Sequence, residues 1–298
     1  LVNPYLALAL TSLFWSGNHI VGRAIAGHVP PYNAALFRWL LPLIIALPFV
    51  HRYLRRDWPH IVDNWKILLF AGLTGGAIFS AAQYVGLGLT TALNTSVLNS
   101  ITPVAIVAVG ALFFRERLSA LQILGIFVSS MGVLFLISRG DFRTLTSINF
   151  NYGDLIILGN MILFAIYSCA LRKLPKLHWL TFIFVIAAIS SCFLIPLAAW
   201  EFVSGQPFEV SLRTVSALLY FGIFVSVLGY ALWSSGLEKL GASSGGPFLH
   251  LIPIYSAVLA YIFLGEKLMA FHALGFALIL CGVWAASGRK AKPANASR

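Results

Sequence analysis

A chain of 298 residues that is 59% hydrophobic and 10% charged has too few polar side chains to cover a soluble protein, since soluble domains carry about 25% charged residues. The composition therefore indicates an integral membrane protein. A formal net charge of +11 does not indicate a nucleic-acid partner, because the 20 Lys and Arg residues form short clusters between apolar segments, as in membrane-protein loops. The 3 cysteines lie singly in apolar segments, without the spacing of a metal site or a redox pair, and we expect no metal or cofactor.

Apolar segments long enough to cross a bilayer follow one another through the chain. A helix needs about 17–25 mostly apolar residues for this. We expect ten such helices, at residues 4–26, 32–51, 66–89, 92–114, 118–138, 153–172, 179–201, 212–238, 242–264 and 269–287. The short connections leave no room for a soluble domain. The expected fold class is an all-α integral membrane protein, with the lipid bilayer as its main partner.

The distribution of Lys and Arg predicts the orientation of these helices, because basic residues near helix ends stay on the cytoplasmic side. With a cytoplasmic N-terminus, fourteen of the 20 basic residues fall on the cytoplasmic side and five on the other, while Arg38 lies inside the second segment. Both termini are therefore expected in the cytoplasm, with residues 289–298 as a basic tail. The expected location is the inner (plasma) membrane of a bacterial-type cell.

Two stretches 150 positions apart resemble each other. Residues 113–133, FFRERLSALQILGIFVSSMGV, share eight identities with residues 263–283, FLGEKLMAFHALGFALILCGV. The chain is therefore expected to consist of two five-helix repeats, residues 1–148 and 149–288. Five is an odd number, so the second repeat enters the membrane from the opposite side and the repeats are inverted. Inverted repeats recur in secondary transporters, whose halves rock around a central site.

Each half ends in the same pattern of a proline, a loop glutamate, a leucine and two glycines. The matched residues are Pro103, Glu116, Leu118, Gly125 and Gly132 in the first half, and Pro253, Glu266, Leu268, Gly275 and Gly282 in the second. This pattern resembles the drug/metabolite transporter superfamily of the ten-helix EamA type, over essentially the whole chain. The resemblance implies export of a small molecule, and amino-acid exporters of the YddG kind are the branch it favours first. Export of drugs or toxic cations by the same fold is the alternative.

Polar and aromatic residues recur at helical spacing within several segments and predict a shared cavity. Amide and indole groups in hydrocarbon are costly unless they meet water, a substrate or each other. We expect the segments at 4–26, 66–89, 92–114, 153–172, 212–238 and 242–264 to line the cavity. The segments at 118–138 and 269–287, rich in Gly and Leu, are expected to be scaffold or the face of a homodimer. The candidate substrate-binding residues are Trp15, Asn18, His19, Gln83, Tyr84, Asn99, Tyr167, Tyr230, Trp233 and His250. For any one of them, core packing is the alternative role.

Prolines within two of the segments predict gates or hinges. Pro103 and Pro253 each remove a hydrogen bond to the carbonyl four residues earlier, and Pro247 adds a second break. His250 lies within this broken stretch, where it either carries a coupling proton or is a hydrogen-bonded core residue. Arg38 either reaches outward to the membrane surface or meets a substrate carboxylate.

Two other classes of membrane protein remain as alternatives. An intramembrane enzyme would need a nucleophile and a base from different helices, whereas Ser243 and His250 lie seven positions apart on one segment. A channel is a closer alternative, because inverted repeats also build pores, but no ring of charged residues is evident. We therefore expect a transporter and not an enzyme.

Overall fold

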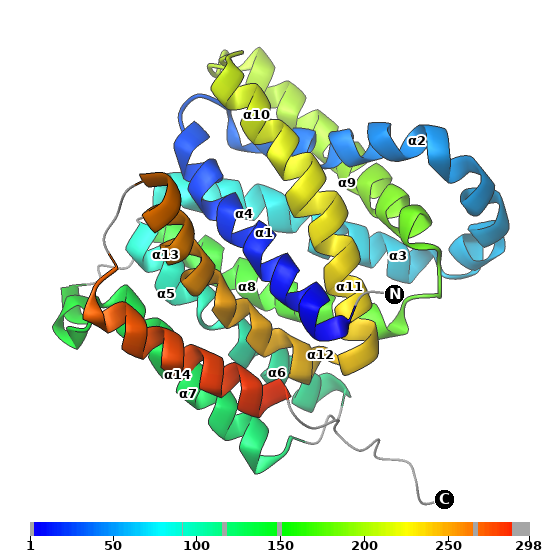
Figure 1. The fold of residues 1–298 in the computed structure, drawn as a ribbon. Helices are drawn as coiled ribbons and strands as arrows, with labels where there is room; N and C mark the ends of the chain where they lie inside the picture. Colours follow the sequence, from blue (N-terminus) through cyan, green and yellow to red (C-terminus); the bar gives the residue numbers. More distant parts are fainter. Residues whose placement is uncertain (1–2, 91, 115–117, 148–150, 265–267, 288–298) are drawn as a thin grey trace, which may run out of the picture.

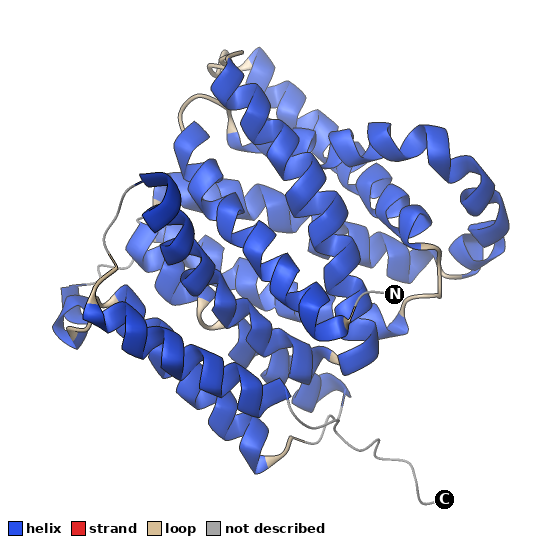
Figure 2. Ribbon diagram, viewed as in Figure 1, coloured by secondary structure: helices blue, strands red, loops and turns tan. Residues whose placement is uncertain are grey.

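All regular structure in the described part of the chain is helical (Figure 2). The computed structural model describes residues 3–90, 92–114, 118–147, 151–264 and 268–287, and no strand occurs among them. Seven helical stretches of these residues have the length and apolar composition to cross a membrane, and the helix at Thr102–Phe113 is a shorter apolar one. The prediction of an all-helical protein is therefore confirmed.

The helices of the first half follow the predicted segments in order (Figure 1). They are α1 (Pro4–Ile25), α2 (Pro31–Asp63), α3 (Trp65–Ala71), the π-helix η1 (Gly72–Ala77), α4 (Ile78–Leu89), α5 (Ala92–Asn99), α6 (Thr102–Phe114) and α7 (Ala120–Ile137), with a short 3₁₀ helix, η2 (Phe142–Ser147), after them. Helices α3, η1 and α4 form one continuous stretch. Helix α2 ends at Asp63, twelve residues beyond the predicted end at residue 51. The added residues, 52–63, include several basic side chains and continue the helix past the apolar segment.

The second half has a parallel sequence of elements. They are α8 (Tyr152–Ala170), η3 (Leu171–Lys173), α9 (Trp179–Val203), α10 (Leu212–Tyr220), the π-helix η4 (Phe221–Leu228), α11 (Gly229–Leu240), α12 (Ala242–Gly245), the 3₁₀ helix η5 (Gly246–His250), α13 (Leu251–Leu264) and α14 (Ala270–Ser287).

Polar residues set several helix starts. Ser119 before α7 accepts a hydrogen bond from the Gln122 backbone N–H at 3.2 Å, and the Gln122 side chain accepts one from the Ser119 N–H at 3.0 Å.

Both halves depart from α-helical geometry at matching places. The π-helices are η1, which begins at Gly72, and η4, which contains Gly222. Longer π-helical stretches are rare, so their occurrence 150 positions apart is a structural counterpart of the sequence repeat. The fourth segment is interrupted between α5 and α6, and the ninth changes to 3₁₀ geometry at η5.

The three predicted hinge prolines lie near the starts of helical elements, unlike Pro42, Pro48 and Pro59, which lie inside α2. Helix α5 ends at Asn99, and Pro103 is the second residue of α6. Pro253 is the third residue of α13, and Pro247 stands in the first turn of η5. A missing backbone N–H costs little in a first turn, because that N–H has no partner within the helix. Each of these three prolines therefore accompanies an interruption or a change of helical geometry in its segment.

Helices α7 and α14 form the most extensively packed pair among the described helices and lie side by side at one edge (Figure 1). A Cβ added at Gly125 would stand 2.5 Å from the backbone nitrogen of Ala286 and 2.6 Å from the carbonyl oxygen of Gly282. Only glycine permits the two backbones to approach so closely. The last helix of each half thus packs on its counterpart.

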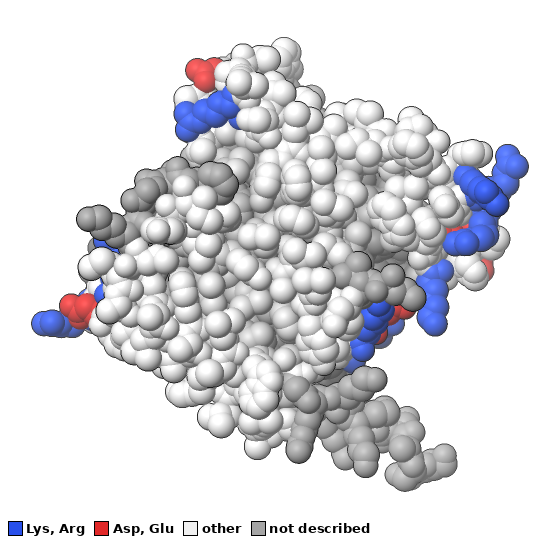
Figure 3. All heavy atoms as spheres, in the orientation of Figure 1, with Lys and Arg blue, Asp and Glu red and all other residues white. Residues whose placement is uncertain are grey.

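The surface is apolar around the middle of the molecule. In the face drawn in Figure 3, Lys, Arg, Asp and Glu side chains gather toward the margins, and an uncharged band lies between them. Many large apolar side chains on the outside are exposed, including Leu112, Phe113 and Trp284, each at least 74% exposed. Such a belt between charged ends fits a protein surrounded by lipid.

Candidate functional site

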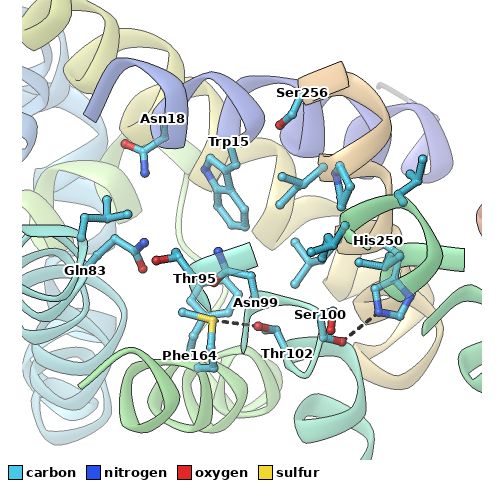
Figure 4. Close-up of a pocket in the computed structure, with 18 of the residues that line it drawn as sticks. Trp15, Asn18, Gln83, Thr95, Asn99, Ser100, Thr102, Phe164, His250 and Ser256 are labelled. Atoms are coloured by element: carbon cyan, nitrogen blue, oxygen red, sulfur yellow. Dashed lines mark hydrogen bonds between the residues drawn. The ribbon is translucent and has the colours of Figure 1, made fainter. Parts of the chain in front are cut away.

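A cavity of about 310 Å³ lies among helices of both halves. This volume suits one small molecule. The first half contributes α1, α2, α4, α5, α6 and α7 to its walls, and the second half contributes α8, η5, α13 and α14. Its polar and aromatic lining residues include Trp15, Asn18, Arg38, Gln83, Thr95, Asn99, Ser100, Thr102, Phe164, His250, Ser256 and His272. In Figure 4, Asn18, Trp15 and Ser256 line one side, facing Gln83, Thr95 and Asn99 across the cavity.

The lining residues lie between the middle of the bundle and one of its ends. On α1, Trp15 and Asn18 stand in the half that ends at Ile25. Arg38 is the eighth residue of α2, and His272 is in the first turn of α14. We call this side of the bundle the Ile25 end. The cavity is therefore off-centre, in the half of the molecule nearest the Ile25 end.

The opposite half of the bundle is filled by direct contacts between helices. Ser12 Oγ donates a hydrogen bond to the Phe248 carbonyl oxygen at 2.8 Å, which joins α1 to η5. Thr11 Oγ1 lies 3.3 Å from the Gly229 carbonyl oxygen of α11. Leu8, one turn earlier on α1, is fully buried. These contacts close the bundle on the side of the cavity opposite the Ile25 end.

An aromatic cluster forms the floor of the cavity. The Trp15 ring lies 5.4 Å from the rings of Phe164 and Trp233 and 5.6 Å from that of Tyr230, measured between centroids. Trp15 Nε1 donates to the Val225 carbonyl oxygen at 3.1 Å, which holds the indole against η4. Offset aromatic contacts of this kind favour a rigid arrangement. Trp15 and Phe164 face the cavity, and the other rings lie behind them.

Four of the predicted substrate-binding residues do not line the cavity. Tyr167, Tyr230 and Trp233 are fully buried in the layer behind Trp15. Tyr84 is also absent from the lining, but its hydroxyl donates to Asn18 Oδ1 at 3.1 Å and so orients a residue that does line it. The side chain of His19 lies outside the described residues. Trp15, Asn18, Gln83, Asn99 and His250 line the cavity together.

Gln83 and Asn160 form an amide pair with a defined orientation. Asn160 Nδ2 donates to the Phe79 carbonyl oxygen at 3.1 Å and to Gln83 Oε1 at 3.2 Å. Because a carbonyl oxygen can only accept a hydrogen bond, the amide nitrogen of Asn160 must face Phe79, and Gln83 must present its oxygen to that nitrogen. Gln83 Nε2 is left buried without a partner.

His250 connects η5 to the interruption of the fourth segment. Its Nε2 lies 3.1 Å from the Ser100 carbonyl oxygen, which follows the last residue of α5 (Figure 4). Its Nδ1 lies 2.7 Å from Ser129 Oγ of α7. Ser129 itself is fully buried and does not line the cavity. Of the predicted hinge residues, Pro253 lines the cavity, whereas Pro103 and Pro247 are buried beside it.

Arg38 is buried within the bundle, with a relative exposure of 1%. Its Nε donates to Ser226 Oγ at 3.2 Å, and its Cζ lies 5.8 Å from the centre of the Tyr230 ring and 5.9 Å from those of Trp39 and Phe79. Of the two roles that the sequence left open, the outward-reaching one is therefore wrong. In the sequence, a lone arginine within an apolar segment was the signal that marked this position as a candidate site.

The set of lining helices differs in part from the prediction. The eighth segment contributes no lining residue among those described, because Trp15 covers it. The second, fifth and tenth segments do line the cavity, through Arg38, Val133 and His272 among others. Ser256 and His272 were missed, since one polar residue in an apolar helix and one at a helix start give no periodic signal.

Comparison with known proteins gives one consistent result. The sequence profile of the EamA-like transporter family matches residues 3–138 and again residues 151–288. A transporter of Archaeoglobus fulgidus without an assigned substrate is 30% identical over 291 residues, covering 96% of this chain and 98% of that protein. A probable amino-acid metabolite efflux pump of Salmonella typhimurium is 26% identical over 294 residues, covering 94% of this chain and 93% of that protein. A solved crystal structure superposes with a TM-score of 0.76 at 18% identity, over 95% of this chain and 96% of the other.

Proposed function

The chain belongs to the EamA-like transporter family, and on that basis we propose that it is a secondary exporter of small metabolites. Amino acids, including apolar and aromatic ones, are the favoured substrates. The observation that carries the proposal is the cavity of about 310 Å³, which has walls from both family-matched halves and a lining that combines amide groups with aromatic rings. A pocket of this kind binds a small amphipathic molecule.

In this proposal the chain crosses the inner membrane ten times as two inverted five-helix repeats. Several observations support the repeats: the two family matches, the π-helices at η1 and η4, and the glycine-mediated pairing of α7 with α14. The excess of Lys and Arg on one side supports cytoplasmic termini. The Ile25 end then faces outward.

Transport proceeds by alternating access in this account. The cavity lies toward the Ile25 end, and the other half of the bundle is closed by the contacts of Ser12 with Phe248 and of Thr11 with Gly229. Rocking one repeat against the other would part these contacts and close the outer half. The interruptions before Pro103 and Pro253 lie beside the cavity and serve as hinges.

Amino-acid export is favoured over the other activities considered. The Salmonella relative is named as a probable amino-acid metabolite efflux pump, and its match covers nearly the whole chain. The lining residues of the described part include the cation Arg38 and no Asp or Glu, which disfavours a toxic cation as substrate. In the buried His250–Ser129 pair, the serine does not line the cavity. The pair therefore gives no support to an intramembrane hydrolase.

Uptake into liposomes that contain the purified protein tests this function. Labelled amino acids, nucleosides and cationic dyes are compared, each with and without a pH gradient. The proposal expects saturable flux of one or more amino acids above that of empty liposomes. Flux confined to dyes would show a drug exporter instead, and flux of none of the compounds would contradict small-metabolite transport.

A further inference from the structure

We infer that Arg38 and Gln83 together bind a carboxylate group of the substrate, so that the carboxylate is required for binding whereas a free amino group is not. This inference rests on the proposed function and specifies its substrate class. It concerns the recognition of one chemical group by two residues on α2 and α4. Transport of a small metabolite as such does not require either residue, although Arg38 already disfavours a cationic substrate.

The first observation is a buried cation without a countercharge. Arg38 lines the cavity, and its Nη1 is buried without a hydrogen-bond partner. The ion pairs of the described residues lie elsewhere: His28 with Glu209, Arg56 with Asp57, and Arg143 with Asp141. The neighbours of Arg38 are neutral and include the Ser226 hydroxyl, the phenol groups of Tyr84 and Tyr230, and three aromatic rings. A guanidinium stays charged even in such surroundings, so burying it unpaired is costly.

The second observation is a further unpaired donor in the same cavity. Gln83 Nε2 is buried without a partner, and the bond from Asn160 to Gln83 Oε1 fixes the amide so that the N–H₂ group is the free one. Gln83 follows Phe79 by one helical turn, and the Phe79 ring lies 5.9 Å from the Arg38 Cζ atom. Two free N–H donors, one of them cationic, therefore belong to residues that line the same cavity, on helices α2 and α4, which pack on each other. They complement an acceptor that carries negative charge.

A carboxylate is the anion that fits best. It accepts several hydrogen bonds in one plane and pairs with the guanidinium of arginine in a bidentate geometry. Arg38 supplies a single positive charge, so a dianionic phosphate would retain uncompensated charge in a site lined largely by apolar groups. A monocarboxylate satisfies both donors and neutralises the site.

The site offers less to an amino group. The lining residues of the described part include no Asp or Glu that could pair with an ammonium ion. The acceptors of the lining are neutral, such as the side-chain oxygens of Asn18 and Asn99. Hydrogen bonds to neutral acceptors are weaker than those to a carboxylate. Loss of the amino group is therefore expected to cost much less affinity than loss of the carboxylate charge.

Ligand binding to the purified protein tests this directly, by titration calorimetry with four compounds of similar shape. L-Leucine carries both groups, 4-methylpentanoate lacks the amine, leucinamide lacks the carboxylate, and 3-methylbutylamine carries only the amine. L-Phenylalanine, L-threonine and inorganic phosphate extend the panel. We expect at least one carboxylate of the panel to bind, leucine and 4-methylpentanoate to differ by less than about tenfold, and the amide and amine to bind at least about tenfold more weakly.

Variants connect this selectivity to the residues. Arg38→Gln removes the charge, Arg38→Lys keeps it without the planar fork, and Gln83→Leu removes the second donor. Carboxylate affinity should fall at least about tenfold in Arg38→Gln, and less in Arg38→Lys and Gln83→Leu. Arg56→Gln, at an arginine whose side chain is 64% exposed, is the matched control and should bind like the wild type. The analogue series on the unaltered protein gives an answer even where a variant fails to fold.

The outcomes separate this inference from the proposed function. Absence of carboxylate binding, equal binding of leucine and leucinamide, preferred binding of phosphate, or unchanged affinity in Arg38→Gln each overturns the inference. Arg38-dependent binding without flux in liposomes would uphold it and contradict the transport function. In the opposite case, Arg38→Gln leaves amino-acid flux unchanged, and 3-methylbutylamine competes with the amino acid as well as a carboxylate does. That result would uphold the transport function and contradict the inference.

Discussion

His250 Nδ1 lies 2.7 Å from Ser129 Oγ, so a residue of η5 is bonded to α7 across the two halves of the chain. Because Nε2 must donate to the Ser100 carbonyl oxygen, Nδ1 of a neutral imidazole is an acceptor. The Ser129 hydroxyl donates to this Nδ1 at 2.7 Å, with the Gly125 and Ile126 carbonyl oxygens as more distant acceptors at 2.9 and 3.0 Å. The imidazole therefore bridges three helical segments at the places where two of them depart from α-helical geometry. This bridge fixes one wall of the cavity.

Removing this bridge should destabilise the protein. His250→Ala removes the hydrogen bonds of the imidazole to the Ser100 carbonyl oxygen and to Ser129, and we expect a loss of about 1–3 kcal/mol in the free energy of unfolding. Ser129→Ala should cost less, and the double variant should show a coupling energy of about 0.6–1.7 kcal/mol. Unfolding in mixed detergents measures all three variants. Strict additivity of the single losses would contradict the bond.

Asn99 and Trp233 should respond differently to truncation, although the sequence predicted both as substrate-binding. Asn99 lines the cavity, so Asn99→Ala should lower amino-acid flux about fivefold, the equivalent of one hydrogen bond of about 1 kcal/mol, while the protein stays folded. Trp233 is fully buried behind Trp15, so Trp233→Ala should destabilise the fold by about 3–5 kcal/mol. Flux in liposomes and monodispersity in gel filtration distinguish the two effects. Equal loss of folded protein in both variants would refute this assignment.

The close approach of α7 and α14 should tolerate no side chain at Gly125. A methyl group there would overlap the backbone of α14, and Gly125→Ala should cost about 1–3 kcal/mol, measured as a lowered melting temperature. Gly159→Ala on α8 is the control, because an added Cβ meets no atom within 4 Å there. Alanine is the better helix former, so this control should keep or raise the melting temperature. A tolerant Gly125 would mean that the two helices are farther apart.

Asp154 should be needed for the connection between the halves at the Ile25 end. Its carboxylate is 1% exposed and accepts hydrogen bonds from Asn94 Nδ2 at 2.9 Å, from the Asn151 N–H at 2.7 Å and from the Thr90 hydroxyl. Asp154→Asn replaces one acceptor oxygen by a donor and should cost about 1–3 kcal/mol in unfolding free energy. Asp141→Asn, at a side chain that is 55% exposed, should change stability little. Similar melting temperatures for the two variants would contradict the structural role of Asp154.

The sequence predicted the helices well, because apolar segments of membrane length have few alternative structures. It could not predict which side chains face the cavity. Tyr230 and Trp233 follow the π-helix η4, where the extra residue per turn shifts the register that a regular helical repeat assumes. Trp15 then covers this face of the bundle. Such a tertiary contact has no sequence signal.

Arg38 shows the opposite case. Its residue type within an apolar segment already indicated a site, but sequence alone could not separate an outward-reaching side chain from one that faces inward. The choice depends on which face of α2 packs on its neighbours. In the structure that face carries Arg38 and Trp39 against η4, α4 and α11. The burial of Arg38 in the structure distinguishes between these two roles, which the sequence periodicity could not.

The central claim, that substrate passes through the cavity, is tested most directly at Ser256. In a protein with Cys169, Cys192 and Cys281 replaced, Ser256→Cys places one thiol in the cavity lining. A membrane-impermeant methanethiosulfonate reagent should stop amino-acid flux in liposomes, and the transported amino acid should slow the modification. Gln206→Cys in the same cysteine-free background, at an exposed position after the end of α9, is the control whose modification should leave flux unchanged. Undiminished flux after complete modification of Ser256→Cys would contradict the account.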